Sequence, residues 1–187
     1  MNHRLTQFLL RLLRPVLKPV ARVYLYLEPY IARAVLKQAR TNPPVMGFAI
    51  LVIRGDDART RARVAEVLEY IARSPRHLAL LRRTLKCISV GAPTVEHGKY
   101  VAPVHACHLA VPQLDTQSVP ALAATVIHAA TQARLHRVGL ETDAGPVPLR
   151  RRAAALCVRA STDFLDSVQH RARGFRATPS PSGLTSA

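Results

Sequence analysis

One segment constrains the fold more than any other, because it predicts a long helix that neighbouring elements must cover. Residues 119–138 carry apolar side chains at helical spacing, which is typical of an amphipathic helix packed on a core. Thr116 or Ser118 can cap its start, just as Asp56 or Asp57 can cap the helix expected over 58–72. Pro120 falls in the first turn, and Gly139 predicts the end of the helix. Small side chains in its middle allow other elements to approach closely. We therefore expect this helix to be largely buried.

The remaining chain supplies elements that can cover this helix. The sequence has 187 residues, 49% of them hydrophobic, with no Trp and only 5% aromatics, which suits one domain with an aliphatic core. Periodicity and turn residues predict helices over 58–72, 77–85 and 149–171, strands over 87–90 and 100–111, and a strand or helix start over 45–53. We expect an α+β fold, mostly helical, with a small antiparallel sheet beside the 119–138 helix.

Charge and composition divide the chain into three parts. Residues 1–43 form a basic amphipathic arm, 44–172 a single domain, and 173–187 a tail with a disordered composition. Residues 1–40 hold eight Lys and Arg side chains against one acid, and the whole chain has a net charge of +16. The arm is expected either to pack on the domain or to bind an anionic surface. Acidic lipid is the favoured partner over nucleic acid, because few aromatic residues accompany the cations.

The location of the protein is predicted from its apolar stretches and cysteines. The longest apolar run, Val45–Ile53, is about half the length that a transmembrane helix needs, so no such helix is expected. The N-terminal residues make a poor secretory signal. Cys87, Cys107 and Cys157 are odd in number and widely spaced, which predicts buried free thiols in a reducing compartment. We expect a cytoplasmic protein that can lie on the periphery of a membrane.

The chemically informative motif lies inside the 119–138 helix. Residues 126–135 read V-I-H-A-A-T-Q-A-R-L. This stretch resembles V-I-H-E-A-T-H-A-R-L, a pattern from a family of uncharacterised bacterial proteins with a zinc-peptidase-like helix. The resemblance covers about residues 78–166 and includes Leu-Arg-Arg at 81–83, a strand at 87–90, Gly-x-Tyr at 98–100, Cys-x-Leu at 107–109 and Arg-x-Arg at 150–152. It implies a zincin-like fold.

The departures from that pattern remove the groups that zinc chemistry requires. In His-Glu-x-x-His, two histidines four residues apart bind one zinc and the Glu takes a proton from the bound water. Here His128 remains, but Ala129 stands in place of the Glu and Gln132 in place of the second His. Two acids of the family's downstream helix correspond to Ala154 and Ser161. The resemblance thus implies a vestigial zinc site, with no catalytic residues and no cofactor.

Three functional hypotheses follow from this motif. The favoured one is a pseudo-enzyme, a peptidase-like scaffold that has lost catalysis and binds a partner. The first alternative is an active metallopeptidase whose zinc is held by His128 with His105 or His108 and Asp163. The second is a basic protein that binds a membrane surface or nucleic acid. In each case we expect His128 and Gln132 to point into a shallow cleft against the strand that contains residues 105–109.

Overall fold

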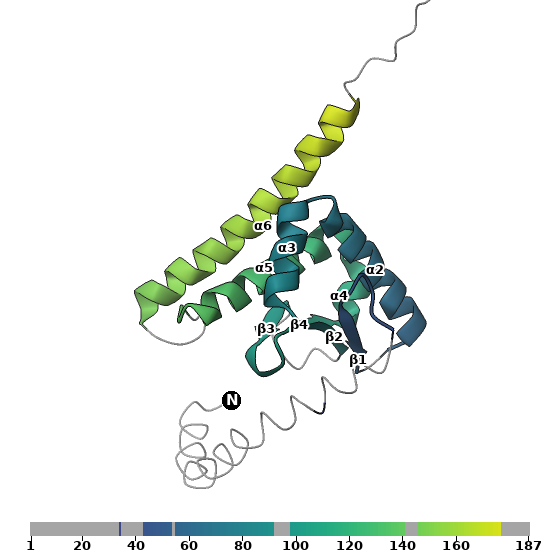
Figure 1. Ribbon diagram of the computed structural model, residues 1–187, viewed down its shortest axis with the longest axis horizontal. Helices are drawn as coiled ribbons and strands as arrows, with labels where there is room; N and C mark the ends of the chain where they lie inside the picture. Colours follow the sequence, from purple (N-terminus) through teal and green to yellow (C-terminus); the bar gives the residue numbers. More distant parts are fainter. Residues whose placement is uncertain (1–33, 35–42, 54, 92–97, 141–145, 177–187) are drawn as a thin grey trace, which may run out of the picture.

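The computed structural model describes residues 34, 43–53, 55–91, 98–140 and 146–176. Within them the fold is α+β and mostly helical, as expected, with a four-stranded sheet at one side of a group of helices (Figure 1). The predicted arm lies outside the described residues apart from residues 34 and 43, and the predicted tail apart from residues 173–176, which belong to the last helix, so that the tail begins later than predicted. Across the described part of the chain, no helix combines the length and the apolar character that crossing a bilayer demands.

The sheet is mixed, so the expectation of an antiparallel sheet is wrong. Its strands are β1 (Ala49–Val52), β2 (Cys87–Gly91), β3 (Lys99–Val101) and β4 (Ala106–Ala110), in the order β1-β2-β4-β3. β2 runs parallel to both β1 and β4, and only β3 is antiparallel to its neighbour. The helices between β1 and β2 make the crossover that parallel strands need. That pairing joins distant segments, so local patterns do not reveal it.

The single extended segment predicted over residues 100–111 is also wrong, because it folds back on itself. A 3-10 turn (Ala102–Val104) follows β3 and contains Pro103, which has no N–H for a strand ladder. His105 then adopts a left-handed conformation with a φ of 49°. This turn pairs Val101 with Ala106 and makes a β3–β4 hairpin. Val111 leaves the sheet and starts a helix.

Five helices complete the described fold: α2 (Asp57–Ala72), α3 (Pro75–Thr84), α4 (Val111–Thr116), α5 (Val119–Arg137) and α6 (Val147–Arg176). The predicted caps are present. The Asp56 carboxylate accepts a hydrogen bond from the Arg59 N–H at 3.2 Å, and the Ser118 hydroxyl accepts one from the Ala121 N–H at 3.4 Å. The helix predicted over 119–138 is confirmed within one residue, and α6 begins two residues earlier than predicted.

One face of the sheet and the inward faces of the helices share the main core. Ile88 on β2 and Leu109 on β4 are fully buried in the same cluster as Leu68 on α2 and Val126 on α5. Phe164 brings α6 into this cluster, and its ring makes edge contacts with Tyr70 and His77. The core is otherwise mostly aliphatic, as the composition predicted. Burial of this kind contributes about 25 cal/mol per Å² of apolar surface.

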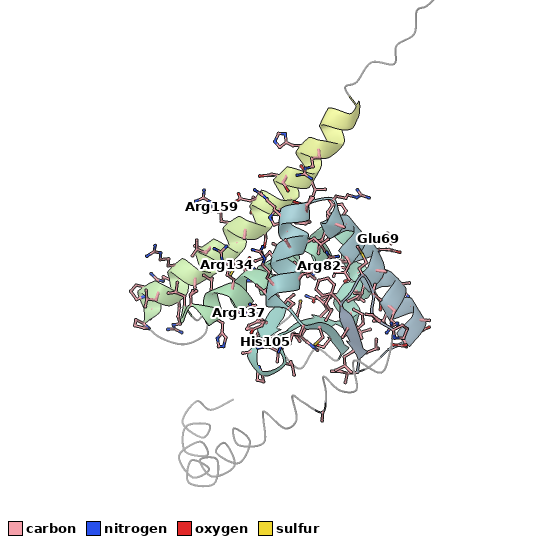
Figure 2. All side chains as sticks on the ribbon, viewed as in Figure 1. Glu69, Arg82, His105, Arg134, Arg137 and Arg159 are labelled. Atoms are coloured by element: carbon pink, nitrogen blue, oxygen red, sulfur yellow. The ribbon has the colours of Figure 1, made fainter. Side chains whose placement is uncertain are left out.

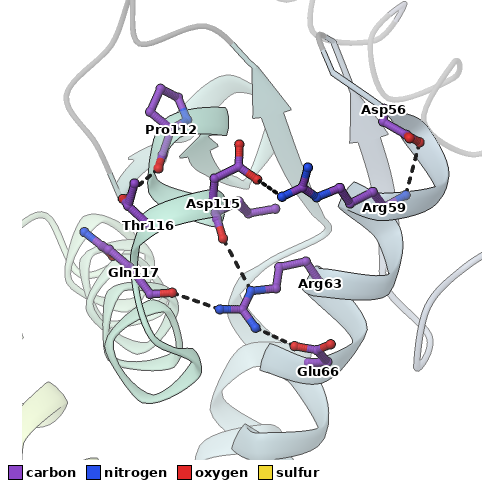
Figure 3. Close-up of polar contacts among 9 residues, drawn as sticks. Asp56, Arg59, Arg63, Glu66, Pro112, Asp115, Thr116 and Gln117 are labelled. Carbon is purple, nitrogen blue, oxygen red and sulfur yellow. Dashed lines mark hydrogen bonds and ion pairs between the residues drawn. The ribbon is translucent and has the colours of Figure 1, made fainter.

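Polar contacts fix the short helix α4 against α2 (Figure 3). The Arg63 guanidinium donates to the Leu114 and Gln117 carbonyls, at 3.3 and 2.9 Å, near the C-terminus of α4. Those carbonyls have no partner within the helix, so the arginine satisfies them. Glu66 pairs with the same guanidinium at 2.5 Å. This clamp fixes the chain immediately before α5, where the motif lies.

Candidate functional site

Helix α5 passes through the middle of the molecule, between α2, α3, α6 and the sheet (Figure 1). Leu122, Val126 and Ala133 point into the main core, as predicted from their spacing. Ala129, at the position of the missing Glu, is also fully buried in that core. The Ala129 side chain therefore packs against apolar neighbours. A carboxylate there would be buried without water.

His128 lies on another side of α5, at a cavity of about 350 Å³. The wall opposite is α6, which supplies Val158, Ser161 and Leu165. The imidazole is half-buried, and this burial lowers the pKa of His128 below its usual 6.5. Among the residues that the structure describes, His128 has no hydrogen-bond or ion-pair partner. A neutral imidazole with both ring nitrogens available therefore faces the cavity.

The location of this cavity corrects the cleft expected from the sequence. The expectation placed it against residues 105–109, whereas its walls come from α5, α6 and Gly98. Cys107 and Leu109 on β4 are fully buried in the main core, so the space between β4 and α5 is filled. α6 instead packs along α5 and leaves a hollow beside His128. The sequence showed the face of the helix but not its neighbour.

Ser161, at the position of one missing acid, lies on the cavity wall with its hydroxyl already engaged. That hydroxyl donates toward the carbonyls of Ala124 and Cys157, each at 3.1 Å. Ala124 is on α5, so this contact joins the two helices beside His128. The other position, Ala154, is exposed on α6 and is not among the residues lining the cavity. Only one of the two positions inferred from the resemblance lies at the cavity.

Gln132 stands at the position that the resemblance assigns to the second histidine, and its side chain binds a strand of the sheet. Its side-chain oxygen accepts a hydrogen bond from the backbone N–H of Tyr100 at 3.0 Å. Tyr100 lies in the middle of β3, the outermost strand on that side of the sheet. The amide oxygen thus satisfies a backbone donor that β4 does not reach. Gln132 has become part of the structure that fixes β3 to α5.

Gly98, the first residue of the Gly-x-Tyr pattern, lines the cavity. Its φ is +69°, and a Cβ built on it would collide with the Thr125 methyl carbon of α5. Glycine is needed for both reasons, the left-handed backbone and the close approach. The Gly-x-Tyr pattern was the signal for this turn, but nothing local showed that it meets α5. Thr125 and Gly98 together line the cavity beside His128.

The residues proposed for a rebuilt metal site lie in separate places. His105, at the turn between β3 and β4 (Figure 2), has its Nδ1 2.6 Å from the Tyr100 hydroxyl. His108 has its Nδ1 3.1 Å from the Ser89 hydroxyl on the neighbouring strand. Asp163 is exposed on α6, 4.0 Å from Arg159. The structure does not bring them together around His128, so that ligand set is wrong.

The donors around His128 do not fit a zinc ion. Zinc sites in proteins take at least three side-chain ligands, and the cavity offers one imidazole with hydroxyls and apolar groups. Among the described residues, no group of three or more His, Cys, Asp or Glu side chains is placed to hold a metal. A thiol nucleophile is also disfavoured, because burial raises the pKa of Cys107 to about 12 and that of Cys157 to about 11.

Comparison with known proteins adds no relative to this picture. No family model matches the chain, and neither the curated proteins nor the solved structures contain a significant match.

Proposed function

We propose that this protein is a non-catalytic binding protein built on a degenerate peptidase-like scaffold. One observation carries the proposal: the motif positions that zinc chemistry would need are used by the fold. Ala129 fills the core, Gln132 binds the Tyr100 N–H, and the Ser161 hydroxyl contacts backbone carbonyls. His128 lies at the cavity and has no hydrogen-bond partner among the described residues. A zinc hydrolase needs a general base and a set of ligands for the metal that activates the water, and the described lining of this cavity supplies neither.

The His128 cavity suits a small uncharged group. Val158 and Leu165 offer apolar surface, while His128 and Thr162 offer polar atoms. Burial keeps the imidazole neutral near pH 7, so it can donate one hydrogen bond and accept another. An amide is the common group that matches this pattern, since it carries both a donor and an acceptor. The ligand class we propose is therefore a peptide or another amide-bearing molecule.

Metal content separates this proposal from the alternative of an active metallopeptidase. We expect purified protein to retain much less than one zinc per chain after dialysis, measured by elemental analysis. We also expect no hydrolysis of casein peptides with or without added zinc. One tightly held zinc per chain that is lost in His128→Ala would overturn the proposal. If the protein retains zinc in His128→Ala as well and hydrolyses nothing, the metal is bound elsewhere and the proposal for the cavity stands.

Restoring ligands tests whether the scaffold descends from a zinc site. In Gln132→His/Ser161→Asp, the new side chains start from the helix face of His128 and from the cavity wall, so we expect one zinc or cobalt ion per chain. The matched control is Gln132→His/Ala154→Asp, which places the carboxylate on exposed helix surface. A cobalt titration followed by visible absorption distinguishes the two. Equal spectra for both variants would contradict the zincin-like interpretation of α5.

The basic character of the chain favours a second candidate function, binding to anionic surfaces. Its specific support is the eight cations within residues 1–40 and the apolar residues at helical spacing between them. We expect Arg4→Gln/Arg11→Gln/Arg14→Gln/Lys18→Gln to weaken binding to vesicles that contain phosphatidylglycerol, more strongly at low salt. Unchanged binding would assign these cations to another role.

We also propose a cytoplasmic location. The three buried free cysteines support a reducing compartment.

A further inference from the structure

A second cavity, of about 460 Å³, lies at the other end of α5 and is lined by arginines. Arg76 and Arg83 come from α3, and Arg134 and Arg137 from the last turns of α5. Figure 2 shows Arg134 and Arg137 on the part of α5 that lies beside α3. Among the described residues, no acidic side chain lines this cavity. The convergence of four cations from two helices is the feature that needs an explanation.

Three arginines elsewhere in the described structure are paired with carboxylates: Arg59, Arg63 and Arg159. Arg59 pairs with Asp115 at 3.0 Å, and Arg63 with Glu66 at 2.5 Å (Figure 3). Within the described residues, none of the four arginines at the cavity has a carboxylate at ion-pair distance. Their positive charges therefore add to one another over a single hollow. Such a local potential attracts an anion and raises its concentration at the surface.

Helix stabilisation explains part of this arrangement but not all of it. Cations in the last turn of a helix interact favourably with its C-terminal carbonyls. This accounts for Arg137, whose guanidinium donates to the Arg83 carbonyl at 2.6 Å. It also accounts for Arg83 and Arg134, which lie in the last turns of α3 and α5. Arg76 is different, because it lies in the first turn of α3, where a positive charge is unfavourable. Its position is explained if it faces an anion that the other three also bind.

We propose that this cavity binds a phosphate group carried by a small molecule or a lipid headgroup. The guanidinium group is planar, permanently charged and able to donate two parallel hydrogen bonds to phosphate oxygens. Their four positive charges exceed the charge of about −2 on a phosphate monoester, so a diphosphate can also be bound. Leu80 and Val138 add apolar surface at the rim, where the remainder of the ligand can lie. The volume is in the range of small-ligand sites, about 300 to 1,000 Å³. This site is separate from the His128 cavity and does not depend on the function proposed there.

The test measures pyrophosphate binding to the full chain by isothermal titration calorimetry in 50 mM and 300 mM NaCl. Arg76→Gln/Arg83→Gln/Arg134→Gln removes three cations at the cavity and keeps Arg137, which holds the end of α3. The matched control, Arg151→Gln/Arg152→Gln/Arg159→Gln, removes three exposed cations from α6. We expect saturable binding that weakens at high salt, a loss of at least about 10-fold in the first variant, and less than about 2-fold in the control.

Two further measurements keep the proposal falsifiable. Arg134→Lys retains the charge of an exposed side chain but loses the two-donor geometry, so we expect a loss of about 3-fold. Vesicles containing phosphatidylglycerol, compared with soluble pyrophosphate, show whether the phosphate comes from a lipid or from a free molecule. Equal losses in both triple variants, or no saturable binding by the folded wild type, would overturn the site. Salt-sensitive binding of duplex DNA with no binding of pyrophosphate would overturn it in favour of a nucleic-acid surface.

Discussion

Helix α5 borders two cavities that differ in how their polar groups are satisfied. Beside its middle, His128 faces α6 across a largely uncharged hollow, and the Ser161 hydroxyl there contacts carbonyls of the fold. At its C-terminal end, Arg134 and residues of α3 line a hollow whose described lining contains cations and no carboxylate. The first region has used most of its polar groups to hold helices together. The second contains four arginines that have no carboxylate at ion-pair distance among the described residues.

This difference separates residues that affect stability from residues that are available for binding. Ala129 packs in the core, so a substitution at this motif position mainly affects the free energy of unfolding. Residues outside the motif, such as Arg76, can carry the binding chemistry instead. A substitution at the first kind of position should change the free energy of unfolding. One at the second kind should change affinity and leave stability nearly constant.

The largest expected effect on the first region comes from Ala129→Glu. Position 129 is fully buried among apolar side chains, so an ionised carboxylate there loses its hydration without gaining a partner. We expect a loss of about 3 to 5 kcal/mol in the free energy of unfolding at pH 7, measured with urea. The control is Ala154→Glu on the exposed face of α6, with a change of about 0.5 kcal/mol or less. Similar effects for both would mean that position 129 faces the cavity.

A smaller effect is expected where the Gly98 turn meets α5. Gly98→Ala introduces a Cβ that collides with the Thr125 methyl and also strains the left-handed backbone. We expect a loss of about 2 to 3 kcal/mol in thermal or urea unfolding. In the double variant with Thr125→Ser, the methyl is gone and the hydroxyl can still donate to the Ala121 carbonyl. Recovery to about 1 kcal/mol, the backbone cost alone, is the expected result. No recovery would show that the collision is not the cause.

The Gln132 hydrogen bond is expected to contribute less again. Gln132→Leu removes the acceptor of the Tyr100 N–H, which costs about 1 to 2 kcal/mol if water does not replace it. Faster hydrogen exchange at the Tyr100 amide should accompany the loss. Gln132→Glu keeps an acceptor oxygen at the same place and serves as the control for helix α5 itself. An unchanged exchange rate in the leucine variant would contradict the structural role of Gln132.

The smallest predicted effect is a pH dependence of stability. Burial lowers the pKa of His128, and burial followed by the charge of Arg76 lowers that of His77. The unfolded chain then binds protons more readily than the folded one below the ordinary value of 6.5, so stability falls as the pH drops from about 6.5 toward the folded pKa values. We expect His128→Gln to flatten this decline by less than about 1 kcal/mol, since the ring is only half-buried. The control is exposed His170→Gln, and an equal flattening there would exclude burial as the cause.

The sequence predicted the elements whose signals are local. Asp56 and Ser118 mark helix starts because a capping side chain acts within three residues of itself, and both caps are present. The pairing of β2 with β4 brings together segments separated by a turn and a third strand, so the parallel arrangement was missed. Gln132 was expected to face a cleft, yet its partner is a backbone N–H 32 residues away. Contacts between segments that are distant in the sequence therefore determine which residues line the candidate site.

The arginine cavity could not be predicted either, because its residues come from two helices that are far apart in the sequence. Arg76 and Arg83 share one face of α3, and Arg134 and Arg137 lie near the end of α5, so each pair reads alone as an ordinary charged helix surface. Only the packing of α3 on α5 brings them to one hollow. The high net charge of +16 predicted an anionic partner in general terms. It could not show which of the basic residues would gather.

The contact between Gln132 and Tyr100 has a consequence for how this protein behaves at high concentration. An edge strand with free N–H groups is a template on which another chain can add a strand, which leads to aggregation. β3 is three residues long, and its central N–H is already occupied from within the molecule. Because the Gln132 side chain satisfies this N–H from within the molecule, the β3 edge offers one donor fewer to a second chain, which disfavours self-association through that edge.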